Sequence, residues 1–471
     1  MDEYTGAKLL KPVSDHVGVS VDRLNFLVCQ IIALCSAFFM RKYLHPSKTS
    51  SNVRHAFCGG MGLALSYFCF GKDIIHLFLI SISSFLIMKM SSPKVMQSAV
   101  FLTCMGYLTI MHVQRLIHST ANYSLDITGP LMVMVQRVTG LAFSLYDGLA
   151  CNMDSLSTYR KKYLTKKQPS FIEYHGYLFQ FQTILTGPNI LFQDYVRFID
   201  GTNFRHPKIK DIESEPPALK IVLKKVTISV LCAVFYLLTS GHFTISTAKG
   251  REFMYEWNLL HQFCYLLTVT SLTRFMYYYA WILAEAICNA SGLGFNGFDE
   301  SGNAKWDLAS NIDILRFEFS DNIRNAINSW NTGTNIWLRF LVYERMENYE
   351  KYKTLSTFLL SAVWHGFYPG YYLCFTTAAL FVSAARTARK FIRPYFLVNK
   401  RLKMAYDLLT IVLARVSIVY LSFPFIMLEF WPSLIIYRRV WFSVHIAALT
   451  MIIALPSIHK YLPRPAAPVV N

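Results

Sequence analysis

Charged residues are scarce in this sequence. Only 16% of the 471 residues are charged, whereas 54% are hydrophobic and 15% are aromatic. Soluble globular chains carry about 25% charged residues, so this composition excludes an ordinary soluble protein. The apolar residues also occur in long blocks, and about 20 of them are enough to cross a bilayer. The sequence therefore predicts an all-α polytopic membrane protein.

Acidic residues are scarcer than basic ones. The chain has 28 Asp and Glu against 46 Lys and Arg, which gives a formal charge of +18. A basic chain first suggests nucleic acid as a partner, but these cations lie between hydrophobic runs, as in loops that face anionic lipid headgroups. We therefore expect the lipid bilayer, and not nucleic acid, to be the partner. A basic entrance would also suit an anionic substrate such as a phosphorylated cofactor.

Paired cysteines and the motifs of familiar soluble enzymes are missing as well. Eight of the 10 cysteines lie inside apolar runs, where a thiol acts as a small hydrophobe: Cys29, Cys35, Cys58, Cys69, Cys104, Cys232, Cys264 and Cys374. We expect neither a disulfide framework nor a metal site. The chain has no Gly-x-Ser-x-Gly elbow, no phosphate-binding Gly-Lys loop and no His-Glu-x-x-His pair.

The polar parts of the chain are short. Residues 1–23 are polar and mixed in charge and do not show a basic region followed by a short apolar region, so we expect no cleavable signal peptide. Residues 201–217 predict a polar linker loop, and residues 457–471 a C-terminal tail. None of them separates two domains, so residues 1–471 are predicted to form a single domain.

About eleven segments, some of them short and re-entrant, are expected to lie in the membrane around an internal tunnel or chamber. Residues 332–346 are too short to span and predict a re-entrant helix, whereas residues 313–328 predict an amphipathic surface helix. Two Thr-Gly-Pro sequences, at 128–130 and 186–188, predict kinked segments that do not span. The apolar blocks behind this expectation are 24–40, 55–70, 74–88, 95–113, 131–146, 179–190, 218–238, 259–290, 355–384, 404–428 and 441–455.

One histidine interrupts the long apolar block at 355–384. If this block is helical, His365 lies roughly 15 Å in from Leu355. An ionisable group at that depth is expensive and by default suggests a functional site. A lone His can also simply donate to a neighbouring helix. Gly366, Pro369 and Gly370 favour a functional site, because they predict a broken helix, and helices break in membranes around cavities.

A general base and an amide suit acyl transfer. A neutral imidazole such as that of His365 can take the proton from a hydroxyl that attacks an acyl carbonyl. The carboxamide of Asn331 can then donate to the developing oxyanion or orient the imidazole. A chamber without water would protect the acyl donor from hydrolysis. The residues alone leave this reaction as one option among several.

Glu285 and Asn289 lie one turn apart in the aromatic block at 259–290, so they share a helical face. Two interpretations are equally open. These residues cap a helix end near the membrane interface, where aromatic residues gather, or they form a polar wall of an internal chamber.

The sequence resembles the membrane-bound O-acyltransferase family. The resemblance rests on Ser329-Trp330-Asn331 and on Trp364-His365-Gly366-x-x-Pro369-Gly370-Tyr371-Tyr372, and it extends from about residue 24 to residue 456. The Asn and the His are the family's two signature residues. Within the family the sequence is most similar to the lysophospholipid acyltransferases, which act on lysophosphatidylethanolamine, lysophosphatidylserine and lysophosphatidylcholine.

The resemblance implies a multi-pass enzyme of the endoplasmic reticulum membrane. It would transfer a fatty acyl group, expected to be unsaturated, from acyl-CoA to the free hydroxyl of a lysophospholipid during phospholipid remodelling. His365 would be the general base, and Asn331 would position the thioester carbonyl or the His. Acyl-CoA is then a co-substrate, with no permanently bound cofactor and no metal. Trp330 and Trp364, together with Glu285 and Asn289, are expected to line the substrate chamber.

Two alternatives stay open at this point. One keeps the family and changes the acceptor to a sterol, a diacylglycerol or a peptide. The other is a transporter without catalysis, since broken helices and polar groups at the membrane midplane suit transporters too. Against the transporter, the two halves show no paired broken segments. The sequence leaves the oligomeric state open.

Two arginines are candidates to bind the phosphates of CoA. Arg339 and Arg345 lie close in sequence to Asn331, as does Lys353. Their alternative role is ordinary contact of long basic side chains with the membrane interface. A change of charge at Arg339 or Arg345 that leaves the KM for acyl-CoA unaltered would exclude them.

Overall fold

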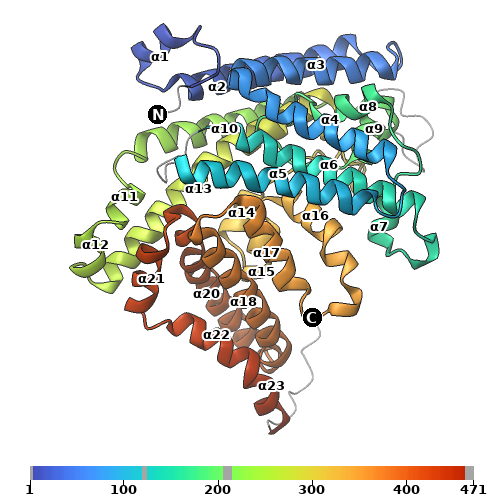
Figure 1. Cartoon of the computed structure of the whole chain (residues 1–471). Coiled ribbons are helices and arrows are strands. Elements are labelled where there is room, and N and C mark those ends of the chain that lie inside the picture. The colour runs from blue at the N-terminus through green and yellow to red at the C-terminus, as the bar shows by residue number, and fades with distance from the viewer. Residues whose placement is uncertain (1–3, 119–124, 205–214, 462–471) are drawn as a thin grey trace. The chain divides into compact units, whose positions relative to one another are not determined.

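The computed structural model describes residues 4–118, 125–204 and 215–461. Within these ranges the chain is helical, and its only strand-like pairings are two isolated bridges, Phe298 with Ala304 and Ile312 with Trp330 (Figure 1). Contacts divide the chain into two compact units. Unit 1 comprises residues 1–232, 278–311 and 332–345, and unit 2 comprises residues 233–277, 312–331 and 346–471.

Unit 1 contains most of the N-terminal helices. In order they are α1 (Lys11–Val17), α2 (Val21–Tyr43), α3 (Ser51–Phe70), α4 (Ile75–Met90), α5 (Met96–His118), α6 (Thr128–Leu149), α7 (Thr158–Tyr163), α8 (Phe171–Leu178), α9 (Phe192–Asp200), most of α10 (Leu219–Thr239), the last part of α13 (Leu259–Ser291) and α16 (Thr332–Leu341). The helix α6 packs against α4, α5, α8 and α16. Because most of its side chains are buried, α6 forms the core of this unit.

The two Thr-Gly-Pro sequences behave differently. The first, at 128–130, does not kink a helix as predicted but begins α6, and Pro130 lies in the first turn, where its missing N–H is tolerated. The second, at 186–188, lies in the buried segment 179–191, which contains no helix at all and is therefore not the kinked segment that the motif predicts. Arg137 of α6 supports this segment by donating to the carbonyl of Leu178 and to the hydroxyl of Thr183.

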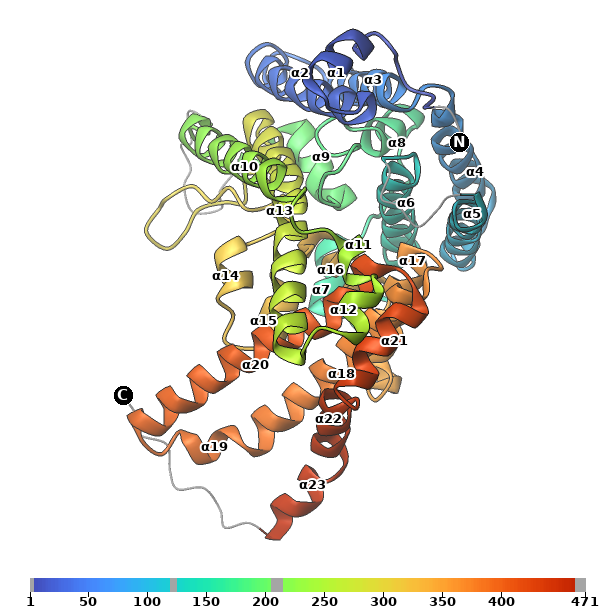
Figure 2. The same ribbon diagram turned by 90° about the vertical axis from the view of Figure 1, so that its left-hand side faces the viewer.

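Unit 2 contains the C-terminal helices. They are α11 (Ile245–Ala248), α12 (Arg251–Tyr255), the first part of α13, α14 (Ile314–Glu318), α15 (Ile323–Asn328), α17 (Lys353–His365), α18 (Pro369–Phe391), α19 (Arg393–Phe396), α20 (Lys400–Met427), α21 (Phe430–Arg439), α22 (Ser443–Ile453) and α23 (Leu455–Ile458). The long helix α18 is central, since α17, α20 and α22 all pack against it (Figure 2).

Residues 313–328 do not form the single amphipathic helix that their alternating pattern predicts. They form the two short helices α14 and α15, each with its own cap. Asp313 accepts a hydrogen bond from the backbone N–H of Arg316 (3.0 Å), and Asn322 accepts one from Asn325 (2.9 Å). The first helix ends at Glu318, and the N-cap Asn322 begins a second one. Residues 332–346 form α16, which is ten residues long, followed by a 3-10 turn at Tyr343–Arg345.

Six helical segments among the described residues are long and apolar enough to cross a membrane. They are Val21–Tyr43, Ser51–Met90, Met96–His118, Leu219–Thr239, Lys400–Met427 and Ser443–Tyr461. An all-α polytopic membrane protein is therefore confirmed, whereas the predicted number of about eleven embedded segments is not. Parts of the predicted N-terminal segment, linker and tail (residues 1–3, 205–214 and 462–471) lie outside the described residues. That residues 1–471 form a single domain stays a prediction.

Candidate active site

The predicted helix break at His365 is present. The helix α17 ends at His365, and Gly366 has φ 120° and ψ −164°. An L side chain rarely adopts this backbone conformation, so glycine is required there. The chain resumes as α18 at Pro369, whose fixed φ suits the first helical position. His365 thus occupies the end of one helix, and three residues separate it from the start of the next.

The start of α18 is fastened to the end of α20. The N–H of Gly370 donates to the carbonyl of Leu428 at 2.9 Å. A Cβ atom at Gly370 would lie 2.1 Å from the carbonyl oxygen of Pro424, so only glycine permits this approach. Leu428 has φ 66°, an unfavourable conformation for a leucine. The break is therefore held in place by a close and strained contact, a feature that concentrates at functional sites.

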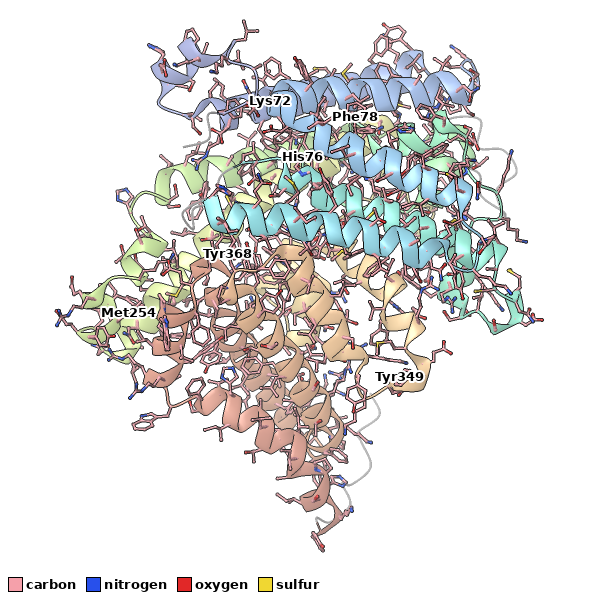
Figure 3. The ribbon with its side chains drawn as sticks, in the orientation of Figure 1. Lys72, His76, Phe78, Met254, Tyr349 and Tyr368 are labelled. Carbon is pink, nitrogen blue, oxygen red and sulfur yellow. The ribbon has the colours of Figure 1, made fainter. Side chains whose placement is uncertain are left out.

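Aromatic rings surround the imidazole of His365. The ring centroids of Trp364, Phe375, Phe425 and Tyr371 lie 4.7, 5.1, 5.1 and 5.6 Å from that of the imidazole. Tyr368, labelled in Figure 3, directly precedes α18 and packs its ring edge-on against Tyr371 at 5.9 Å. The imidazole is only partly buried. A partly accessible imidazole thus lies among aromatic rings.

Asn331 occupies a constrained backbone position. Its φ is 47°, which Asn tolerates better than most residues because its short side chain hydrogen-bonds locally. The preceding Trp330 pairs with Ile312 in a bridge, and its ring contacts Phe317 (5.0 Å between centroids) and Tyr277 (5.7 Å). Asn331 is partly exposed. The contacts of Trp330 therefore fix the backbone next to Asn331.

An ion pair network supports this anchor. Glu318, at the end of α14, accepts from Arg274 of α13 at 2.8 Å and from Arg415 of α20 at 3.3 Å. Both guanidinium groups also lie over the ring of Phe317, at 5.4 and 5.5 Å. In addition, α15 packs against α18 and α20. The residues that lead to Asn331 are thus fixed to the two helices whose aromatic residues surround His365.

Glu285 and Asn289 are both buried in the last turns of α13, in unit 1. The carboxylate of Glu285 pairs with the ammonium of Lys225 at 2.6 Å and accepts from the hydroxyl of Ser310. Lys225 also donates to the carbonyl of Trp306 at 3.0 Å. Glu285 therefore has its charge compensated, while the carboxamide of Asn289 has no hydrogen-bond partner among the described residues. Their role in lining a chamber stays a prediction.

Arg345 belongs to a buried charge cluster in unit 1. Two of its nitrogens, at 2.8 and 2.7 Å, donate to the carboxylate of Asp147, which is fully buried and also pairs with Arg160. Asp147 is not among the predicted site residues, although an acidic residue within an apolar helix is itself a signal. Arg345 and Asp147 are 198 positions apart, so spacing gives no hint of their contact.

Arg339 lies in a more accessible environment. Its guanidinium pairs with Glu344 at 2.8 Å and lies 4.4 Å from the ring centroid of Tyr159, yet 53% of the side chain is exposed. Lys353, in unit 2, pairs with Glu350 at 2.9 Å. Of the two arginines predicted to contact CoA, Arg339 is the one whose charge a ligand can reach. The CoA role of both stays a prediction.

These features define a class of protein: a polytopic helical membrane protein with a histidine at a helix break and an asparagine on a constrained turn. Residues 115–427 match the membrane-bound O-acyltransferase (MBOAT) family, and this match includes both Asn331 and His365. Since the match covers more than half of the sequence, the chain belongs to the membrane-bound O-acyltransferase family.

Relatives from three organisms align with almost the whole chain. It is 44% identical to lysophospholipid acyltransferase 6 of Drosophila melanogaster over 464 residues, which cover 97% of this chain and 64% of the fly protein. It is 37% identical to membrane-bound glycerophospholipid O-acyltransferase 1 of Homo sapiens, covering 96% of this chain and 92% of the human one. A lysophospholipid acyltransferase of Schizosaccharomyces pombe is 31% identical over 93% of this chain and 86% of its own length.

Proposed function

We propose that this protein transfers a fatty acyl group from acyl-CoA to the free hydroxyl of a lysophospholipid. It is an O-acyltransferase by its family, and its relatives in fly, human and yeast are named for lysophospholipid or glycerophospholipid acylation. The chain spans 64% of the length of the fly relative but 92% of the human one. The reaction belongs to phospholipid remodelling, and the endoplasmic reticulum membrane is the proposed location.

The proposed base is His365. A neutral imidazole nitrogen takes the proton from the glycerol hydroxyl as its oxygen attacks the thioester carbonyl carbon. A new C–O bond forms, and the tetrahedral intermediate then collapses by breaking the C–S bond. The CoA thiolate leaves and takes up the proton held by the imidazolium. Atoms and charges balance, and no metal or redox group takes part in these steps.

Asn331 is proposed to stabilise the negative charge on the former carbonyl oxygen. A preorganised amide donor in a site that excludes water stabilises such an oxyanion more than it stabilises the neutral carbonyl. The positive φ of Asn331 and the packing of Trp330 against Phe317 support this preorganisation, because both restrict the carboxamide before substrate binds.

One observation carries this proposal. Both signature residues lie in unit 2, and α15, which leads to Asn331, packs against α18 and α20, which contribute Tyr371, Phe375 and Phe425 around His365. The apolar rings also favour a lipidic substrate and limit hydrolysis of the thioester. Acyl-CoA is the proposed donor, since a thioester supplies the activated acyl group that an O-acyltransferase needs.

The test uses the purified full-length protein with oleoyl-CoA and a panel of lysophospholipids that differ in headgroup. We expect release of CoA that depends on the lysophospholipid, together with the matching diacyl product by mass spectrometry. A sterol, a diacylglycerol and a peptide serve as the competing acceptors. Acylation of one of these with none of any lysophospholipid would overturn the proposed acceptor.

A further inference from the structure

A cluster of uncompensated positive charge lies at the far end of α18 from His365. We name it the basic collar, and it comprises the end of α18, α19 and the start of α20. Its members are Arg386, Arg389, Lys390, Arg393, Lys400, Arg401 and Lys403. The sequence from residue 351 to residue 406 contains no Asp or Glu at all, so this stretch carries a single sign of charge.

Most of the basic collar is exposed and without an acidic partner. All of its members except Arg393, which is partly buried, have exposed side chains. Arg386 donates to the hydroxyl of Thr354 at 2.9 Å, and Lys403 lies 3.8 Å from Asp407. Among the residues that the structure describes, the other five form no ion pair. Their charge is therefore available to an external anion.

The charges at the start of α20 are not explained by the helix itself. Lys400, Arg401 and Lys403 lie in its first turn, which contains no acidic residue. The N-terminus of a helix carries a partial positive charge, so cations there destabilise the helix. Arg389 and Lys390, by contrast, lie in the last turn of α18, where cations are favourable. Lys400 and Arg401 have no acidic partner among the described residues, so an external anion would offset this unfavourable charge.

The neighbouring surface of α20 indicates what that partner is. Large apolar side chains are exposed along the helix directly after the collar: Met404, Leu408, Leu409, Val412 and Leu413. The helix is one of the six segments suited to cross a membrane, so lipid tails are the natural cover for this face. Figure 2 shows the ends of α18 and α20 joined by α19. The collar therefore lies at one end of a helix that is suited to cross a membrane.

We propose that the basic collar binds anionic phospholipid headgroups of the cytosolic leaflet. The cytosolic leaflet carries the negative surface potential, and Lys and Arg near the ends of membrane helices are enriched on that side. The partner is a lipid surface and not the phosphates of CoA. This assignment also places the C-terminal end of α18 and the N-terminal end of α20 on the cytosolic side of the membrane. It is independent of the acyl-transfer proposal.

The test compares the wild-type protein with a variant that carries Arg389→Gln, Lys390→Gln, Lys400→Gln and Arg401→Gln. Both are reconstituted in nanodiscs of phosphatidylcholine mixed with phosphatidylserine, and the phosphatidylserine that remains bound is counted by native mass spectrometry. Since each cation near a membrane surface adds to the attraction, we expect the variant to lose at least about tenfold in phosphatidylserine binding. Raising the salt concentration should weaken binding by the wild type more than by the variant.

A matched control keeps the charge and changes the side chains. The variant with Arg389→Lys, Lys390→Arg, Lys400→Arg and Arg401→Lys should bind phosphatidylserine as the wild type does, because the attraction is electrostatic. Equal thermal unfolding of all three proteins shows that the loss is not one of folding. Unchanged phosphatidylserine binding by the Gln variant would overturn the proposal.

Two further measurements complete the test. The first distinguishes lipid headgroups from CoA as the source of the bound phosphate, and the second determines the side of the membrane on which the collar lies. The KM for acyl-CoA of the Gln variant should equal that of the wild type, and a raised KM with unchanged phosphatidylserine binding would assign the collar to CoA instead. In sealed microsomes, a cysteine introduced by Lys400→Cys should react with an impermeant maleimide from the cytosolic side. Reaction only after the membrane is opened would contradict the proposed orientation.

Discussion

The polar groups buried in unit 1 and the histidine in unit 2 have different kinds of neighbours. In unit 1 the buried carboxylates are paired with cations, Asp147 with Arg160 and Arg345, and Glu285 with Lys225. In unit 2 aromatic rings surround His365 at a helix break. Paired charges fix helices to one another, whereas an accessible imidazole among apolar rings can exchange protons with a substrate. The difference separates residues that hold the fold from residues proposed to perform the reaction.

The largest effect is expected from removing Asp147, the carboxylate of the charge cluster in unit 1. Asp147→Ala leaves the guanidinium groups of Arg160 and Arg345 without their carboxylate, and breaking such a buried pair costs about 3–5 kcal/mol. We expect a large fall in thermal stability with an unchanged kcat for the protein that remains folded. Asp154→Ala, which removes an exposed carboxylate nearby, is the control and should leave stability as it is. A stable but inactive Asp147→Ala protein would place Asp147 in the reaction.

Substitutions of Asn331 test the second half of the comparison, the role of unit 2 in the reaction. Removing an oxyanion donor lowers kcat by about a hundred- to a thousandfold, so Asn331→Ala should be nearly inactive yet stable. Asn331→Gly keeps the backbone at φ 47° without strain and removes the same carboxamide. Steady-state kinetics should show equal losses for both variants. If Asn331→Gly were as active as the wild type, only the backbone conformation of Asn331 would matter.

Gly370 tests whether the helix break depends on its contact with α20. Gly370→Ala places a methyl group against the carbonyl of Pro424, and overpacking of this kind costs about 1–3 kcal/mol. We expect lower stability and lower activity together, because α18 and α20 both contribute rings around His365. Gly106→Ala is the matched control, because a Cβ at this position meets nothing within 4 Å. The stability of both variants is compared by denaturation. An unaffected Gly370→Ala protein would show that the break tolerates a looser contact.

The smallest effect is expected at Arg339. Its side chain is 53% exposed, and single exposed charge contacts contribute up to about 1 kcal/mol. If Arg339 contacts the phosphates of CoA, Arg339→Gln should raise the KM for acyl-CoA about two- to fivefold while kcat stays constant. Steady-state kinetics with varied acyl-CoA measure this change. An unaltered KM would remove Arg339 from the CoA site.

The sequence predicts local features of the fold better than distant contacts. Gly366 and Pro369 predict the break after His365 because their backbone preferences are local. The charge cluster of Asp147 and Arg345 joins residues 198 positions apart, and no periodicity carries that information. The apolar spacing of the segment 313–328 predicts one helix, but the N-caps at Asp313 and Asn322 begin two separate helices.

The candidate site also divides into local features that the sequence predicts and distant contacts that it does not. His365 and Asn331 are identified from residue type and neighbouring motif, whereas the support of Trp330 by Phe317, Arg274 and Arg415 is visible only in the folded chain. The two Thr-Gly-Pro sequences show why motif alone is insufficient. The same three residues begin α6 in one place and lie in a buried irregular segment in the other, because tertiary packing decides how proline is accommodated.

The most direct test of the account is CoA release by purified His365→Ala protein, with oleoyl-CoA and a lysophospholipid that the wild type acylates. Loss of a general base lowers the rate by about a hundred- to ten-thousandfold. We expect a loss of this size, with unchanged thermal unfolding and unchanged binding of acyl-CoA. CoA release as fast as that of the wild type would contradict the assignment of His365 as the base.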